Sequence, residues 1–243
     1  MYYKKNIILN LFLFLTFSFY KTATFAQAGF KVTYVGKVVS SSVSSRISEE
    51  VKDIKTRKAF LEMLNEYKII YNLFLETSTG KSIMVEYKEF PLEGPPPFKE
   101  KFSYSNNIDN YSEIYFRGKT FKIKDSKKSL SWKITTIKQK IGSFSCQKAI
   151  LSDDPFNSVA WFTTDIPLSV GPSFSNGLPG AVVLYENDYF TLTMEDIKKV
   201  ILPKDIVSKL KNYSDLKGIS IQEYFKKTTP ILNKMKSEKI IND

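Results

Sequence analysis

The stretch GPSFSNGLPGAVVLYEND, residues 171–188, places backbone-constraining residues directly before an apolar segment. Three of the ten glycines and two of the ten prolines lie between positions 171 and 180. In Leu178-Pro179-Gly180-Ala181, proline sets φ at the second position and glycine supplies a positive φ at the third, which predicts a type II turn. The apolar residues 181–184 predict a buried strand. The connection from Asp165 to Gly180 is therefore expected to be a stiff crossing or the lip of a binding site.

Short apolar stretches separated by turn residues precede and follow this segment. They are residues 30–39, 69–77, 81–87, 112–117, 119–125, 131–136, 143–151, 159–167, 181–187 and 189–196. Because no helical pattern separates most of them, they predict one largely antiparallel sheet. Residues 88–111, which contain EGPPPF, are expected to form a long, rigid connection.

Helical patterns occur near both ends of the sequence. Apolar residues recur at helical spacing over residues 46–66, which predicts a long helix. Pro203 begins a short helix, and Ser220 with Glu223 forms a capping box before a last helix that Pro230 is expected to kink or divide. The predicted fold class is α+β and β-rich, a curved antiparallel sheet or open half-barrel with C-terminal helices.

The first 26 residues have the layout of a secretory signal peptide, with Lys4 and Lys5 before an apolar run and a small-residue site ending at Ala26. The sequence therefore predicts export to the periplasm or the cell surface. Residues 27–195 are expected to form the β domain, and residues 196–243 a helical segment packed on the sheet or partly mobile. Removal of the leader lowers the net charge from +11 to +8.

The missing residue types restrict the chemistry. The chain has no histidine and a single cysteine, Cys146, which excludes Ser-His-Asp and Cys-His nucleophiles, histidine-based zinc sites and an intramolecular disulfide. No cofactor, metal site or catalytic residue is predicted. Cys146 is either a small buried apolar residue or a reactive thiol.

Positive charge is concentrated in residues 117–148, which hold ten basic residues and one acid, Asp125. This region is either a solvated sheet face or an anion-binding patch. The basic residues are almost all lysine, whereas nucleic-acid readers rely on arginine, so no nucleic-acid partner is expected. The lysine-rich C-terminal segment permits membrane association only peripherally.

Aromatic side chains in the predicted strands suggest either a core or a ligand cavity. They are Trp132, Phe144, Trp161, Phe162, Phe174 and Tyr185. A curved antiparallel sheet leaves one concave face on which such side chains can hold a ligand.

An ordered series of residues resembles the GLPGLI family of exported proteins from Bacteroidota. The series is Trp132, Cys146, Trp161, Asp165, Pro167, Gly171, Pro172, Gly177, Leu178, Pro179 and Gly180. Ala181-Val182 stands where the family name has Leu-Ile, which keeps the apolar strand. The resemblance implies a cell-envelope protein and brings no established activity. By analogy alone, the strand-rich layout looks like the open half-barrel of lipoprotein carriers.

Three functions remain compatible with these patterns. The first is a non-catalytic binding or carrier protein for an apolar ligand or a partner protein. The second is an envelope assembly module that acts through a sheet edge or its lysine-rich face. The third is a carboxylate-based hydrolase, which requires at least two of Asp153, Asp165, Glu186 and Asp188 to converge in one cleft.

Overall fold

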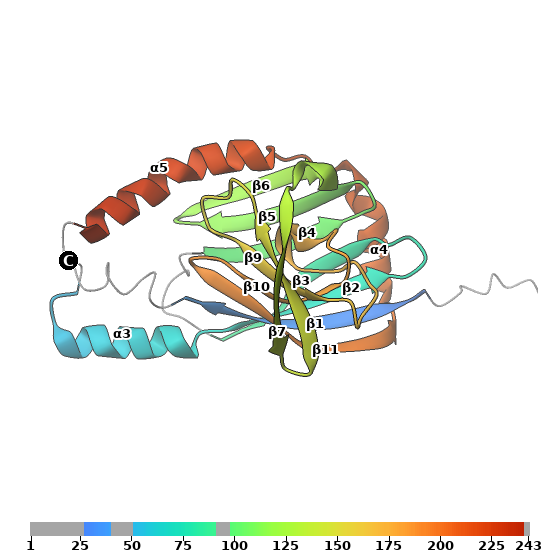
Figure 1. The fold of residues 1–243 in the computed structure, drawn as a ribbon, viewed down its shortest axis with the longest axis horizontal. Coiled ribbons are helices and arrows are strands. Elements are labelled where there is room, and N and C mark those ends of the chain that lie inside the picture. Colours follow the sequence, from blue (N-terminus) through green and yellow to red (C-terminus); the bar gives the residue numbers. More distant parts are fainter. Residues whose placement is uncertain (1–26, 40–50, 91–97, 241–243) are drawn as a thin grey trace, which may run out of the picture.

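The computed structural model describes residues 27–39, 51–90 and 98–240, without the side chains of residues 214 and 235–240. Its strands form one open antiparallel sheet of 11 strands in the order β6-β5-β4-β3-β2-β1-β11-β10-β9-β8-β7 (Figure 1). The strands are β1 (Ala28–Val38), β2 (Ile69–Glu76), β3 (Ser82–Glu89), β4 (Phe98–Ser105), β5 (Asp109–Phe116), β6 (Lys119–Ser126), β7 (Trp132–Ile141), β8 (Phe144–Leu151), β9 (Val159–Thr163), β10 (Ala181–Glu186) and β11 (Phe190–Ile201).

The first strand lies in the middle of the sheet. β1 pairs with β2 on one side and with β11 on the other, so the first and last strands of the chain are neighbours. From this centre, β2 to β6 and β11 to β7 extend outward as two meanders of hairpins. The prediction of a largely antiparallel sheet is therefore confirmed.

The short connection between the two edge strands requires the sheet to be curved. A flat sheet of 11 strands would separate β6 from β7 by about 48 Å at ~4.8 Å per strand interval. β6 ends at Ser126 and β7 begins at Trp132. Six residue steps reach at most about 20 Å, so the two edges must approach each other at this end of the sheet. The sheet thus has a concave inner face and a convex outer face.

In the described ranges, three α-helices accompany the sheet: α3 (Ile54–Glu66), α4 (Lys204–Asn212) and α5 (Ile221–Ile240). α3 begins at Ile54 rather than at residue 46, because Asp53 accepts a hydrogen bond from the Thr56 backbone N–H and caps the helix. Residues 40–50 lie outside the described ranges. α5 is one helix that continues through Pro230, so the predicted division at this residue is wrong.

The C-terminal helices lie on opposite faces of the sheet. Ile206 and Leu210 of α4 pack on the outer cluster that contains Phe74, Ile83 and Tyr104. Tyr224 and Phe225 of α5 belong to the larger inner core. No helix in the described ranges is long and apolar enough to cross a membrane.

Two predicted boundaries are wrong. Residues 88–111 are not one connection, because β4 occupies Phe98–Ser105 within them. β11 continues to Ile201, so the helical segment begins at Lys204 and not at residue 196.

Candidate functional site

The loop between β9 and β10 occupies the interior of the curved sheet. Residues 170–176 are all buried, and they include the short 3-10 helix η2 (Ser173–Ser175). η2 contacts β5, on the opposite half of the sheet. The Trp132 indole N–H donates to the Phe174 carbonyl at 3.1 Å and fixes the loop to the start of β7. Residues 170–176 of this loop are therefore part of the core.

Gly180 has a different role from the predicted one. Its φ is not positive, and its backbone N–H donates to the Leu178 carbonyl at 2.8 Å, so the type II turn prediction is wrong. A Cβ at this position would overlap the carbonyl oxygen of Thr163 on β9. Glycine is needed because two backbone segments approach closely. Gly177, with φ 111°, is the glycine in this loop that adopts a left-handed conformation.

The strand that follows is buried as predicted, since Ala181 and Val182 are fully inaccessible. Of the other residues in the series that resembles the GLPGLI motif, Cys146 and Asp165 line one pocket, whereas Trp132 and Trp161 are not in its lining. Asp165 accepts a hydrogen bond from the Ser145 backbone at 3.4 Å, and the Trp161 indole donates to Glu186 at 3.2 Å. Pro167 and Pro179 are exposed, whereas Gly171, Pro172 and Leu178 are buried.

Cys146 is buried on β8, as the first of its two interpretations predicts. Burial raises the pKa of its thiol, which lowers the fraction of reactive thiolate. It lies beside a cavity of about 80 Å³ lined by Lys138, Phe162 and Asp165, among others.

The inner face of β4 carries an unexpected carboxyl group, Glu100. It is 1% exposed, and it accepts a hydrogen bond from the Ser112 hydroxyl of β5 at 2.8 Å. Ser173 of η2 is a second hydrogen-bonding neighbour. Burial raises the pKa of Glu100 to about 8, and the two serines only partly offset this effect. Glu100 is therefore mostly protonated at neutral pH.

A second buried carboxyl group comes from the turn between β8 and β9. Asp154 accepts hydrogen bonds from the backbone N–H groups of Phe156 at 3.1 Å and Ser158 at 2.8 Å. Burial raises its pKa in spite of these bonds. The Ser158 hydroxyl also lies 2.9 Å from the hydroxyl of Tyr185 on β10.

Two buried tyrosine hydroxyls lie near these carboxyl groups without a hydrogen-bond partner among the described residues. They belong to Tyr71 on β2 and Tyr224 on α5. Burial raises the pKa of both hydroxyls. The charge of Glu100 raises it further in both, and the charge of Asp154 does so in Tyr224. Because an unpaired buried hydroxyl is costly, these groups indicate where a polar ligand atom would be stabilised.

A small cavity brings Asp154 and Tyr224 against an aromatic wall. Glu100 is not in its lining, but Ser173 is a hydrogen-bonding neighbour of both Glu100 and the lining residue Tyr185. The cavity lining is Phe98, Ile114, Leu151, Asp154, Phe156, Ser158, Phe174, Tyr185, Asn187, Tyr224 and Phe225. The cavity volume of about 10 Å³ is room for one water molecule. Phe174 and Tyr185 line this small cavity and are buried in the inner core, as the core interpretation of the aromatic residues predicts. The other aromatics of that prediction, Trp132, Phe144, Trp161 and Phe162, are not in its lining.

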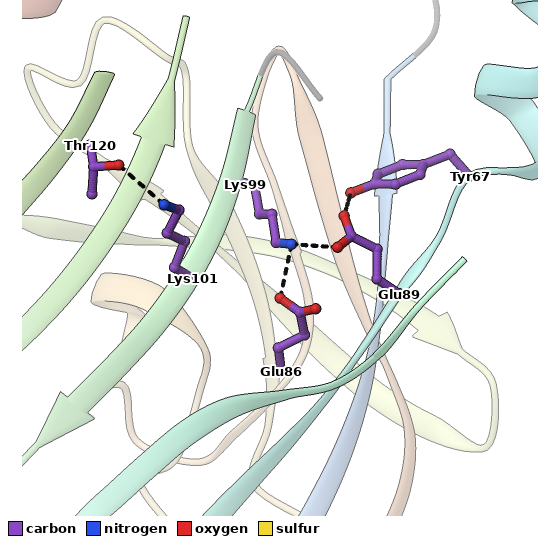
Figure 2. A network of polar contacts seen from close by, with 6 residues as sticks. All are labelled: Tyr67, Glu86, Glu89, Lys99, Lys101 and Thr120. Atoms are coloured by element: carbon purple, nitrogen blue, oxygen red, sulfur yellow. Dashed lines mark hydrogen bonds and ion pairs between the residues drawn. The ribbon is translucent and has the colours of Figure 1, made fainter. Parts of the chain in front are cut away.

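The backbone ladder between β3 and β4 is incomplete. Its last pair is Val85 with Phe102, although β3 continues to Glu89 and β4 begins at Phe98. In this gap Lys99 forms ion pairs with Glu86 at 2.9 Å and with Glu89 at 2.7 Å (Figure 2). The hydroxyl of Tyr67, which follows α3, donates to Glu89 at 2.6 Å.

These contacts replace backbone pairing with side-chain pairing. Burial alone would raise the pKa of Glu89, but the hydrogen bonds from Lys99 and Tyr67 hold this pKa below its usual range. Burial alone would lower the pKa of Lys99, but Glu86 and Glu89 raise it. On the neighbouring side, Lys101 donates to the Thr120 hydroxyl at 3.3 Å (Figure 2).

The four acids proposed for a hydrolase have separate surroundings. Asp153 lies in an exposed turn with φ 56°, and Asp165 accepts from Ser145. Glu186 accepts from Trp161, and Asp188 accepts from Asn157 at 2.8 Å. No hydrogen bond in the described part of the chain brings two of these acids together.

No group of three or more Cys, Asp or Glu side chains in the described ranges could hold a metal ion. The interior carboxyls can accept hydrogen bonds or pair with a positive group, and aromatic side chains lie beside Asp154 in the cavity lining.

No family model and no curated protein matches this sequence. Among solved structures, PNGF-II in a C2 crystal form is 16% identical, with a TM-score of 0.46 over 86% of this chain and 33% of that chain. The P21 form of PNGF-II gives a TM-score of 0.44, 16% identity and coverage of 82% and 32%. This chain thus spans about a third of the length of PNGF-II. An uncharacterized conserved protein from Thermus thermophilus is 9% identical, with a TM-score of 0.37 and coverage of 80% and 90%.

Proposed function

We propose that this chain is an exported envelope protein of the GLPGLI type that binds an apolar or amphiphilic ligand on the concave face of its sheet. In this proposal it resembles lipoprotein carriers, with α5 as a movable cover. The leader-like residues 1–26 and the ordered motif support the export and family parts. The ligand-binding part rests on one observation: a helix, and not strand pairing, covers an aromatic-lined interior.

The attachment of α5 fits a cover that is fixed at one end. Ile219 exchanges backbone hydrogen bonds with Lys122 and Lys124 of β6, both at 2.9 Å. Asp125 of β6 accepts from the first N–H of α5, that of Ile221, at 2.9 Å. Beyond this point, Tyr224 and Phe225 are held by side-chain packing in the inner core. A ligand chain can replace such packing without breaking the sheet.

Replacing Phe225 by alanine is expected to increase affinity for a neutral apolar fluorophore, N-phenyl-1-naphthylamine, by about tenfold or more. The substitution enlarges the cavity that Phe225 lines. An empty apolar cavity left by a Phe→Ala change costs several kcal/mol of folding free energy, and a ligand that fills it recovers part of this cost. The measurement is a fluorescence titration of the purified full chain. Phe102→Ala is the matched control, since Phe102 packs on Tyr213 on the outer face, with ring centroids 4.9 Å apart.

The control should lose stability without gaining affinity. An equal gain in both variants would show that loosening of the fold, and not the interior, binds the fluorophore. Absence of saturable binding to the wild-type chain and to Phe225→Ala would overturn the proposed function.

The exposed edge of the sheet supports a second candidate, an assembly module. On β7, Ile134 is 46% and Ile137 is 52% exposed, which is unusual for large apolar side chains on an edge strand. The β7–β8 hairpin, residues 132–151, holds four lysines and no acid. Two copies of this edge would bring lysines face to face, which is unfavourable. The edge therefore fits an extended acidic segment of a different protein.

A labelled peptide of alternating glutamate and valine tests this candidate. The double substitution of Lys138 and Lys140 by glutamate is expected to weaken its binding at least tenfold. The same change at the exposed Lys204 and Lys211 of α4 should alter binding less than twofold. Equal losses in the two variants would indicate attraction to net charge alone and would remove the β7 edge as a specific site.

A further inference from the structure

We propose that the interior site selects an amphiphile with a positively charged ammonium head, which binds between Glu100, Asp154 and the unpartnered hydroxyls of Tyr71 and Tyr224. This inference rests on the proposed function, because the apolar chain of such a ligand needs the space that α5 now covers. It adds the chemical class of the head group.

The sign of the buried charge is the first argument. Although the chain carries a net charge of +11, the buried charged residues in the described ranges are Glu76, Glu100 and Asp154. None of the residues that line the cavity is basic. Burial without a positive partner favours the neutral form of a carboxyl group, and an ammonium group would supply the positive partner that Glu100 and Asp154 lack.

The unpartnered hydroxyls are an independent argument. Tyr71 and Tyr224 are each 2% exposed or less, and their oxygens have no partner among the described residues. Tyr224 lines the cavity, and its electrostatic neighbours are Tyr185, Asp154 and Glu100. A tyrosine oxygen accepts hydrogen bonds, and an ammonium group offers up to three N–H donors. The same group could therefore satisfy a carboxylate and a hydroxyl.

The aromatic wall adds a third contribution. Phe156 and Tyr224 are stacked, with ring centroids 5.5 Å apart and an interplanar angle of 9°. Phe98 meets Phe156 edge-on at 6.1 Å. A cation within about 6 Å of such a ring is attracted by its π-electrons, most strongly where water is excluded.

Other head groups leave these features unsatisfied. An anionic head would meet the Asp154 carboxyl group, and no basic residue lines the cavity. A neutral alcohol would partner one hydroxyl and leave both carboxyl groups without a positive partner. The pKa of Glu100, raised by burial to about 8, supports the same view, because a nearby cation would restore its ionised form.

Three ligands of equal chain length test the inference: decylammonium, decanol and decanoate, each used to displace N-phenyl-1-naphthylamine from the full chain at pH 7. Decylammonium is expected to bind at least tenfold more tightly than decanol, and decanoate least tightly. Glu100→Gln should reduce the preference for decylammonium over decanol at least fivefold, and Tyr224→Phe should reduce it by a smaller factor. Glu113→Gln is the control, because Glu113 pairs with Lys122 away from the cavity.

The outcomes separate the inference from the proposed function. If the three ligands bind equally, or if decanoate binds best, the ammonium inference is overturned and the binding function stands. If Glu100→Gln and Tyr224→Phe both keep the full preference, the assigned site is wrong. If none of the ligands displaces the fluorophore, and none binds directly by calorimetry, the proposed function itself fails.

Discussion

Replacing Glu100 by glutamine is expected to stabilise the protein by about 4 kcal/mol at pH 8 and above, with little effect near pH 4. The buried carboxyl has a pKa of about 8 in the folded chain, against 4.5 for its ordinary value. Each unit of this difference is worth about 1.4 kcal/mol. Glutamine resembles the protonated acid and does not ionise.

The direction follows from proton binding. Between pH 4.5 and 8 the folded chain holds a proton on Glu100 that the unfolded chain has lost, so the wild-type free energy of unfolding falls as pH rises. Urea unfolding at intervals from pH 4 to pH 9 measures the difference between the two proteins. Glu62→Gln on the exposed face of α3 should leave the pH profile unchanged. Parallel wild-type and Glu100→Gln curves across this range would contradict the prediction.

Gly180→Ala is expected to destabilise the protein by about 3 kcal/mol, because the new methyl group would overlap the Thr163 carbonyl and neither backbone segment can move freely. Thr163 pairs with Ala181, so the strain falls on the β9–β10 ladder. Thermal and urea unfolding measure the loss.

Two nearby substitutions separate the cost of a steric clash with another strand from the cost of an unfavourable backbone conformation. Gly177→Ala should cost about 1 kcal/mol, since its positive φ is strained for alanine but only the Lys127 side chain lies within 4.0 Å. Pro179→Ala, at an exposed position, should change stability by less than about 0.5 kcal/mol. A larger loss for Gly177→Ala than for Gly180→Ala would show that conformation dominates in this loop.

The succession of strands could be predicted because turn residues separate most of them. Gly80 and Gly118 both have positive φ, and the hairpins β2–β3 and β5–β6 fold around them. Local chemistry decides such hairpins, so sequence patterns are sufficient. The role of Gly180 could not be found in this way, because the atom that requires glycine belongs to Thr163, a residue of another strand.

β4 was missed because its alternation is interrupted. A bulge lies between Glu100 and Phe102, so Phe98 packs in the inner core whereas Phe102 packs on the outer face. In the sequence, the three prolines directly before Phe98 indicate a rigid connection instead of a strand. The same interruption concealed Glu100, the central residue of the candidate site.

The rest of the site is assembled from distant segments. Tyr71, Glu100, Asp154 and Tyr224 come from four separate elements or turns, and none of them stands in a recognisable motif. Tyr185 was among the aromatic residues considered for a ligand cavity. The excess of lysine made the buried acids harder to predict, because a net charge of +11 does not indicate an acidic interior. Only the curvature of the sheet and the position of α5 bring these residues together.

The central position of β1 has a consequence for how the chain folds. The ladder between β1 and β11 joins residue pairs as distant as Ala28 and Ile201, so the middle of the sheet cannot close until almost the whole chain has been synthesised. Contacts of such high sequence separation make folding slow. Until β11 arrives, β1 exposes an unpaired edge to other chains. A nascent or truncated chain that ends before residue 190 is therefore an aggregation-prone intermediate. The same delay would suit the export that we propose, because the N-terminus stays accessible while the chain is unfolded.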